Sequence, residues 1–185
     1  MATPDPTVLL RPLPRAQIGT LGALLPAGVS LVEPLRVLSL RCLPGSEAAL
    51  AATTGTLPGP GRFTGTDPLL VWRSPSEWLH VGTRDEPADA LLRALPPGGA
   101  TQAIDLSDGI AVFELQGPRL DALLPRLLDA GVQLGVPGQG TRARLADIAV
   151  VALRLAPERL WLLIDRANAH YLAHWLAYAS AALQQ

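Results

Sequence analysis

Hydrophobic and polar positions along the chain alternate between strand-like and helix-like patterns from residue 35 onward. The predicted elements of the first half are a strand from Leu35 to Leu43, a helix from Ser46 to Gly55, strands from Leu69 to Arg73 and from Glu77 to Gly82, a helix from Glu86 to Leu95, and a strand near Thr101 to Leu106. A Gly/Pro-rich loop, LPGPGRFTGTDP, is expected between the first helix and the second strand. The Ser74-Pro75-Ser76 segment predicts a turn, because proline cannot donate to a strand ladder.

The second half repeats this order of elements. The predicted elements are a strand from Ile110 to Gln116, a helix from Arg119 to about Asp129, strands near Arg142 to Leu155 and from Leu160 to Ile164, and a helix from Ala167 to Leu183. A glycine-rich loop, GVQLGVPGQG, separates the first helix of this half from its later strands.

Two pairs of segments suggest an internal duplication. RSPSEWLHVGTR, ending at Arg84, matches LAPERLWLLIDR, ending at Arg166, and Pro75 and Pro157 each stand nine residues before the arginine. LRCLPGSEAAL, ending at residue 50, resembles FELQGPRLDAL, ending at residue 123. The repeated order predicts an α+β fold of duplicated ferredoxin-like β-α-β-β-α units with antiparallel sheets.

The predicted domain organisation is an N-terminal arm, residues 1–34, and one domain, residues 35–185, with half-units at about 35–106 and 107–185. The arm is rich in Pro, Gly and Leu and predicts one short helix near Ala16 to Leu25. Each half-unit would leave one apolar sheet face open, so we expect the two copies to bury those faces jointly. Tryptophans Trp72, Trp78 and Trp161 fall in the predicted strands and are expected in the core, with an interface role left open for Trp78.

The composition and charge of the chain limit the classes of function that it can have. The 185 residues include 49% hydrophobic and 17% charged positions, and the formal net charge is -1. All 15 basic residues are arginine, and no basic field favours nucleic acid or a membrane surface. With one cysteine, Cys42, no internal disulfide can form, and the N-terminus has prolines where a signal peptide would be apolar, so a cytoplasmic location is expected.

Residues with catalytic potential are few, and the sequence predicts no catalytic, cofactor-binding or metal-binding residue in this chain. His170 and His174 have the i, i+4 spacing of metal ligands but lack a third ligand, so we interpret them as helix-surface residues. Cys42 stands in an apolar strand and is expected to be buried. The segment Asp105-Leu106-Ser107-Asp108-Gly109 predicts a tight turn; in the alternative, Asp105 or Asp108 holds a substrate amine or a partner arginine.

Three segments resemble the gamma subunit of heterotetrameric sarcosine oxidase: LVWRSPSEWLHVG from Leu70, AIDLSDGIAVFELQGPRLDALL from Ala103, and ERLWLLIDRANAHYLAHWL from Glu158. The resemblance covers about residues 35–180 and implies a fold related to the folate-binding aminomethyltransferase of the glycine cleavage system. The candidate partner-contact residues within these motifs are Trp72, Glu77, Trp78, Asp105, Ser107, Asp108 and Arg119.

The resemblance also implies a complex that oxidises sarcosine to glycine and passes the one-carbon unit to tetrahydrofolate. It places FAD, FMN, NAD, tetrahydrofolate and zinc in the alpha, beta and delta subunits, with which this chain would assemble. The first hypothesis is therefore a non-catalytic accessory subunit. The alternative is a stand-alone folate-binding or aminomethyltransferase-like protein, and the loop GVQLGVPGQG carries neither the cysteine nor the acid of related folate proteins.

Overall fold

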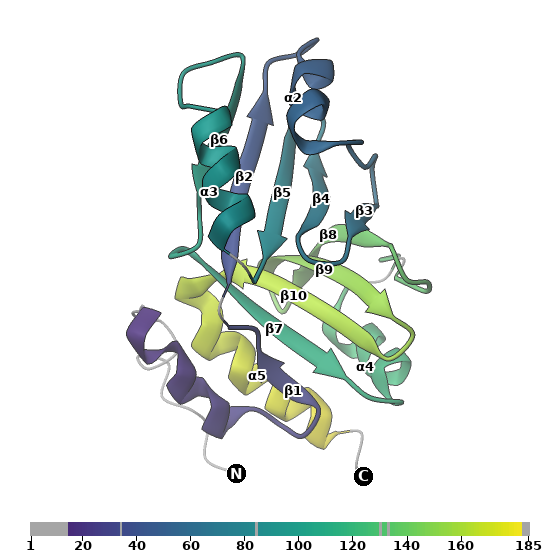
Figure 1. The fold of residues 1–185 in the computed structure, drawn as a ribbon. Coiled ribbons are helices and arrows are strands. Elements are labelled where there is room, and N and C mark those ends of the chain that lie inside the picture. The colour runs from purple at the N-terminus through teal and green to yellow at the C-terminus, as the bar shows by residue number, and fades with distance from the viewer. Residues whose placement is uncertain (1–14, 34, 84, 130, 133, 183–185) are drawn as a thin grey trace. The chain divides into compact units, whose positions relative to one another are not determined.

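The computed structural model describes residues 15–33, 35–83, 85–129, 131–132 and 134–182, and two compact units are distinguished within the chain (Figure 1). The N-half unit comprises residues 33–107 with 138–141, and the C-half unit comprises residues 1–32, 108–137 and 142–185. Residues 1–14 of the predicted arm, Arg84 of the first repeat motif and Leu183 at the predicted end of the last helix lie outside the described residues.

The N-half unit is one five-stranded antiparallel sheet covered by two helices, with strand order β3-β4-β5-β2-β6. Its elements are β2 (Arg36–Cys42), α2 (Glu47–Thr54), β3 (Phe63–Gly65), β4 (Leu69–Ser74), β5 (Glu77–Gly82), α3 (Asp85–Ala94) and β6 (Thr101–Asp105). Leu38 and Leu40 of β2 pack with Leu50 of α2 and Leu91 of α3 in one apolar cluster. Alternation along the strands directs these side chains to the helix-covered face.

The C-half unit repeats the arrangement with strand order β1-β7-β10-β9-β8. Its elements are the 3₁₀ helix η1 (Arg15–Leu24), β1 (Val29–Leu31), β7 (Ile110–Gln116), α4 (Leu120–Leu127), β8 (Gly140–Leu145, apart from its first two residues), β9 (Ile148–Ala156), β10 (Arg159–Asp165), η2 (Arg166–Asn168) and α5 (Ala169–Ala181). Leu123 of α4 and Leu172 and Leu176 of α5 pack against Phe113 and Leu162 of the sheet. The α+β fold with two antiparallel sheets is therefore confirmed.

The β4–β5 hairpin of the N-half unit and the β9–β10 hairpin of the C-half unit have the same strand register. Every cross-strand pair between β4 and β5 becomes a pair between β9 and β10 when 82 is added to both numbers, from Leu69↔Val81 to Ser74↔Glu77, and both hairpins shift register next to their last pair. This offset is the one that the aligned motifs around Pro75 and Pro157 predict, so that part of the alignment is confirmed.

The alignment of the first strand of each repeat was displaced by two residues. It set residue 40 against residue 113, but the pairing Leu38↔His80 corresponds to Phe113↔Leu162, an offset of 75. The helices α2 and α4 keep the offset of 73. The connection between strand and helix is therefore two residues shorter in the C-half unit, and the even difference leaves each side chain on its expected face.

Two short strands were not expected from the sequence. β3 lies in the predicted Gly/Pro loop and pairs with β4, and β1 lies in the predicted arm and pairs with β7. In the C-half unit β1 takes the edge position beside β7 that β6 takes beside β2 in the N-half unit. The C-half sheet therefore takes its edge strand from residues 29–31, which precede the N-half unit in the sequence. The helix expected near Ala16 to Leu25 is present as η1.

The second face of each sheet also carries buried side chains, among them Val81 in the N-half unit and Leu153 in the C-half unit. Joint burial of the two open faces stays a prediction. None of the helices in the described parts of the chain has the length and apolar character needed to cross a membrane.

Candidate functional site

The candidate residues named from the sequence fall into three places in the fold. Trp72, Glu77 and Trp78 lie on the β4–β5 hairpin. Asp105 is the last residue of β6, and Ser107 and Asp108 lie in the turn between β6 and β7. Arg119 immediately precedes α4 in the C-half unit.

Glu77 is the centre of a charged cluster on the β2–β5 surface. One carboxylate oxygen, Oε1, accepts hydrogen bonds from Ser39 Oγ at 2.6 Å, Arg73 Nη1 at 2.9 Å and Arg41 Nη2 at 3.3 Å. The Glu77 side chain is 13% exposed, and that of Arg41 is 53% exposed. Two guanidinium groups around one carboxylate leave a net positive charge, and Arg41 presents part of it to solvent. A carboxylate of a partner chain would be attracted to this place.

The two tryptophans of the hairpin are cross-strand neighbours on the helix-covered face. Trp72 pairs directly with Trp78. Trp78 is 4% exposed, and its indole Nε1 donates to the Pro58 carbonyl oxygen at 2.9 Å. Trp72 is half-buried against the same cluster. Within this chain Trp78 therefore serves as a core residue with its polar group satisfied.

The segment from Asp105 to Ser107 is a hydrogen-bonded turn. Asp105 Oδ1 accepts from the Ser107 backbone N at 2.9 Å and from Ser107 Oγ at 2.6 Å. Ser107 Oγ in turn accepts from the Val37 backbone N at 3.0 Å, and Ser107 is 4% exposed. These contacts fix the end of β6 against β2 and account for both side chains in structural terms.

Asp108 contributes its backbone to a second structural contact, within the C-half unit. Arg166 Nε donates to the Asp108 carbonyl oxygen at 2.6 Å, and Arg166 Nη2 donates to the Ile110 carbonyl oxygen at 2.9 Å. The arginine shared by the two aligned motifs thus ties the start of η2 to the turn before β7.

Arg119 lines a shallow hollow of about 310 Å³ in the C-half unit, together with residues of β7 and the segment before β1. Apart from Arg119, its lining consists of uncharged residues, including Gly28, Gln116 and Ser180. The hollow carries no second charged side chain or histidine that would act with Arg119 in catalysis.

Sequence reasoning missed two arginine clusters. Arg36 donates to Asp85, Asp89 and Asp105 at 3.1 Å each, across sequence separations of 49 to 69 residues. Arg154, 1% exposed, pairs with Asp121 of α4 at 2.8 Å and also donates to the Pro157 carbonyl oxygen. No local pattern marks either cluster, because the partners come together only when the sheets form.

The remaining reactive side chains do not converge. Among the described residues no group of three or more His, Cys, Asp or Glu side chains could hold a metal ion. Cys42 is 7% exposed, and burial, aided by the nearby Glu47 carboxylate, raises the pKa of its thiol. A thiol with a raised pKa is a poor nucleophile at neutral pH.

The fold and the site together define a class of protein: a duplicated α+β chain with two antiparallel sheets, whose candidate polar residues lie largely in structural contacts. The glycine cleavage system aminomethyltransferase T from Bartonella henselae shares this fold, with a TM-score of 0.54 and 16% identity over 86% of this chain and 48% of that chain. No family model matches the chain.

The particular family follows from two stronger similarities. The chain is 35% identical over 155 residues to the sarcosine oxidase subunit gamma of Corynebacterium sp. (strain U-96), covering 75% of this chain and 72% of the relative. It is also similar to a chain in the structure of heterotetrameric sarcosine oxidase from Corynebacterium sp. U-96 in complex with pyrrole 2-carboxylate, with a TM-score of 0.78, 27% identity and coverage of 92% and 94% of the two chains. The chain belongs to the family of sarcosine oxidase gamma subunits.

Proposed function

We propose that the chain is a non-catalytic accessory subunit of a heterotetrameric sarcosine oxidase-like complex, assembled with alpha, beta and delta subunits. The complex would oxidise sarcosine to glycine with tetrahydrofolate as the one-carbon acceptor, and FAD, FMN, NAD, tetrahydrofolate and zinc would be bound by the partner subunits. The observation that carries the proposal is the similarity to a chain of a heterotetrameric sarcosine oxidase over 92% of this chain and 94% of the other.

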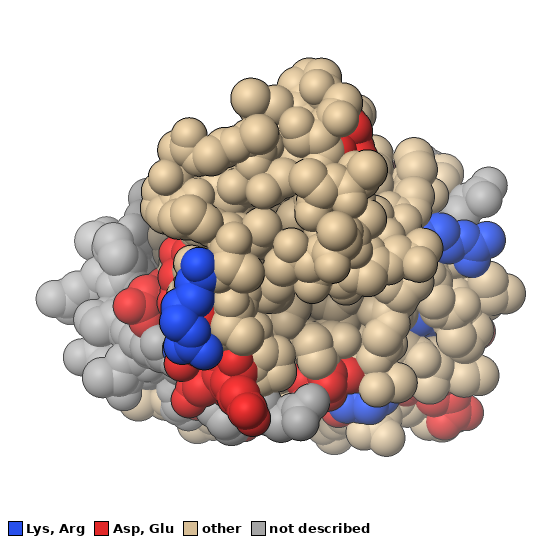
Figure 2. Space-filling model, turned by 45° about the horizontal axis from the view of Figure 1, so that its top comes forward, with Lys and Arg blue, Asp and Glu red and all other residues tan. Residues whose placement is uncertain are grey.

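A low-charge surface on the N-half unit supports assembly with partners. Residues 42–61 contain one charged residue, Glu47, and residues 94–104 contain none. The two segments adjoin, because the Leu43 backbone N donates to the Ala100 carbonyl oxygen at 2.8 Å. In the view of Figure 2, uncharged side chains cover most of the visible face and charged side chains gather towards its edges.

Leu43 is the prominent apolar side chain of this low-charge surface, with 61% of it exposed. Interface cores are depleted in charged residues relative to the rest of a protein surface. Burying the exposed part of a leucine contributes about 1 to 2 kcal/mol, on the basis of about 1.5 to 3 kcal/mol for a whole side chain. We therefore assign Leu43 to the interface with a partner subunit.

Co-expression with alpha, beta and delta subunits of a heterotetrameric sarcosine oxidase tests the proposal. We expect the four chains to co-purify and to oxidise sarcosine, and the isolated chain to be inactive. Leu43→Asp should reduce the recovered complex at least about tenfold, because a carboxylate without a partner would be buried in place of the leucine. Leu43→Met, which keeps the apolar character, is the matched control, and circular dichroism of both variants reports folding.

Two results would contradict the accessory role. One is an isolated chain that stays monomeric in the presence of all three partner chains. The other is micromolar tetrahydrofolate binding together with aminomethyl transfer by the isolated chain, which would favour the stand-alone alternative.

A further inference from the structure

The duplication provides an internal comparison for the helix-covered face of each sheet. With the offset of 82 that holds for the hairpins, His80 of β5 corresponds to Leu162 of β10, which is fully buried. With the offset of 73 that relates α2 to α4, Thr54 corresponds to Leu127, which is 3% exposed. Two leucines that fill the core of the C-half unit are thus replaced by polar residues in the N-half unit.

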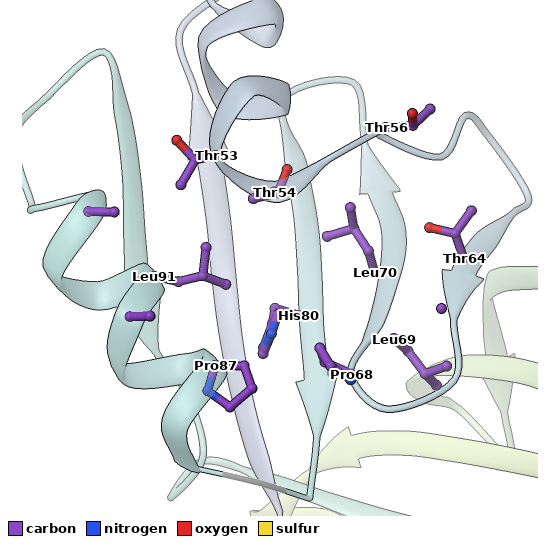
Figure 3. A pocket seen from close by; sticks show the side chains of 13 residues that line it. Thr53, Thr54, Thr56, Thr64, Pro68, Leu69, Leu70, His80, Pro87 and Leu91 are labelled. Carbon is purple, nitrogen blue, oxygen red and sulfur yellow. The ribbon is translucent and has the colours of Figure 1, made fainter.

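The N-half unit has a pocket at this place. Its volume is about 560 Å³, which lies in the range typical of small-molecule sites. The pocket lies between the end of α2, the β3–β4 turn, β5 and α3, and Figure 3 shows His80 between Leu91 of α3 and Leu70 of β4. In the C-half unit, α5 instead brings Leu172 and Leu176 onto the sheet.

His80 is the one residue with a titratable side chain among those that line this pocket. His80 is 5% exposed, and its Nδ1 has no hydrogen-bond partner in the described part of the chain. Burial lowers the pKa of His80 below its ordinary 6.5, while its own backbone and the Asp67 carboxylate act in the opposite direction. The ring is therefore neutral at pH 7 and presents one donor and one acceptor nitrogen.

The pocket wall also limits the charge of a ligand. Its lining consists of apolar residues, glycine, His80 and the threonines Thr53, Thr54, Thr56 and Thr64, with no charged residue. A buried ammonium or carboxylate group would lack a counter-charge here, and its desolvation would oppose binding. A hydroxyl group suits a neutral imidazole, because it both donates and accepts a hydrogen bond.

We propose that this pocket binds a small, uncharged, mostly apolar organic molecule whose hydroxyl group forms a hydrogen bond with His80. The site lies entirely within the N-half unit, so it does not depend on the accessory role proposed above. A hydrogen bond to the His80 ring adds to the apolar contacts with the pocket wall, and it favours a ligand with a hydroxyl group over an apolar ligand of the same shape.

Benzyl alcohol and toluene are matched probes for the full chain, alone or in complex with its co-expressed partners. They share an aromatic ring, and the alcohol adds the hydroxyl group. Titration followed by NMR of ¹⁵N-labelled histidine side chains should show saturable binding of benzyl alcohol with a Kd of about 1 mM or below, and a selective shift of the His80 ring nitrogens. The resonances of His170 and His174 serve as internal controls.

Two substitutions assign the binding to this pocket. Ala90→Phe places a ring in the pocket from an exposed position on α3 and should abolish binding of both probes. Ala122→Phe, at an exposed position on α4, is the matched control and should leave both affinities unchanged. His80→Leu should lower the ratio of benzyl alcohol affinity to toluene affinity about fivefold, the value of one hydrogen bond of ordinary net strength.

The results separate this proposal from the accessory role. Absence of saturable binding, or binding that persists in Ala90→Phe, overturns the ligand site. An affinity ratio unchanged in His80→Leu overturns the role of the histidine. Either failure leaves the co-purification test of the complex unaffected, and a failure to assemble leaves the probe titration unaffected.

Discussion

Replacing His80 with leucine should stabilise the protein, because the substitution reproduces the residue found at the equivalent position of the C-half unit. Leu162 there is fully buried, whereas His80 is buried with an unpartnered Nδ1. Removing an unsatisfied buried polar atom is worth about 1 to 3 kcal/mol. Histidine and leucine have similar side-chain volumes, and His80 borders an existing pocket, so the substitution neither opens a large void nor overfills the core.

Thermal and urea unfolding at pH 7 measure this effect. For a chain of this size, about 1 kcal/mol shifts Tm by about 2 to 4 °C, so we expect His80→Leu to raise Tm by about 2 to 12 °C. The reciprocal substitution Leu162→His is the matched control. It should destabilise the C-half unit by about 2 to 4 kcal/mol, since it places a polar ring in a filled core.

The same substitution has a pH signature. The pKa of His80 is lower in the folded state than its ordinary value of 6.5, so below pH 6.5 the unfolded chain binds a proton that the folded chain does not. The free energy of unfolding of the wild type is therefore at its full value above pH 6.5 and declines as the pH falls towards the folded pKa of His80. The stability difference between His80→Leu and wild type should therefore widen between pH 7 and pH 5. A variant that is no more stable at pH 7 and shows a constant difference with pH would refute this reasoning.

Further predictions concern the charged clusters and the interface. Glu77→Gln should destabilise the folded chain by about 1 to 3 kcal/mol, measured by urea unfolding, since two guanidinium groups lose their counter-charge. A destabilisation of the same size in 1 M NaCl and at low salt would argue against this electrostatic cause. Asp121→Asn should destabilise by about 1 to 3 kcal/mol because it leaves the buried Arg154 without its carboxylate, and Arg154→Met in the same chain should restore most of the loss. If the double variant is no more stable than the single one, the pair is not the cause. Leu43→Asp should lower the yield of assembled complex at least about tenfold, whereas Leu43→Met should not.

The order of strands and helices could be predicted from the sequence because each half follows a regular pattern with clear breaks. Pro75 and Pro157 mark the same hairpin turn twice, and the register of the two hairpins agrees with their alignment. The strands β1 and β3 were missed because each has three residues, too few for an alternating pattern. Both are held by pairing with a longer strand, which a local pattern does not reveal.

The candidate site was harder to predict than the fold. The partners of Arg36 lie 49 to 69 residues away, so only the folded sheet brings them together. The sequence carries one signal of the pocket, because the aligned motifs set His80 against Leu162. In a duplicated chain, a polar residue opposite a core leucine of its twin indicates a place where the two copies have diverged in function.

The position of β1 has a consequence for how the chain can be divided. The ribosome releases this strand before the other strands that the structure describes, and its partner β7 follows about 80 residues later, so β1 has no strand to pair with until synthesis has passed residue 116. A gene fragment that starts at residue 108 would encode a module without its outermost strand, and the open β7 edge would favour aggregation. A circular permutant that joins the residues of β1 to the C-terminus through a linker would gather the whole module into one continuous stretch.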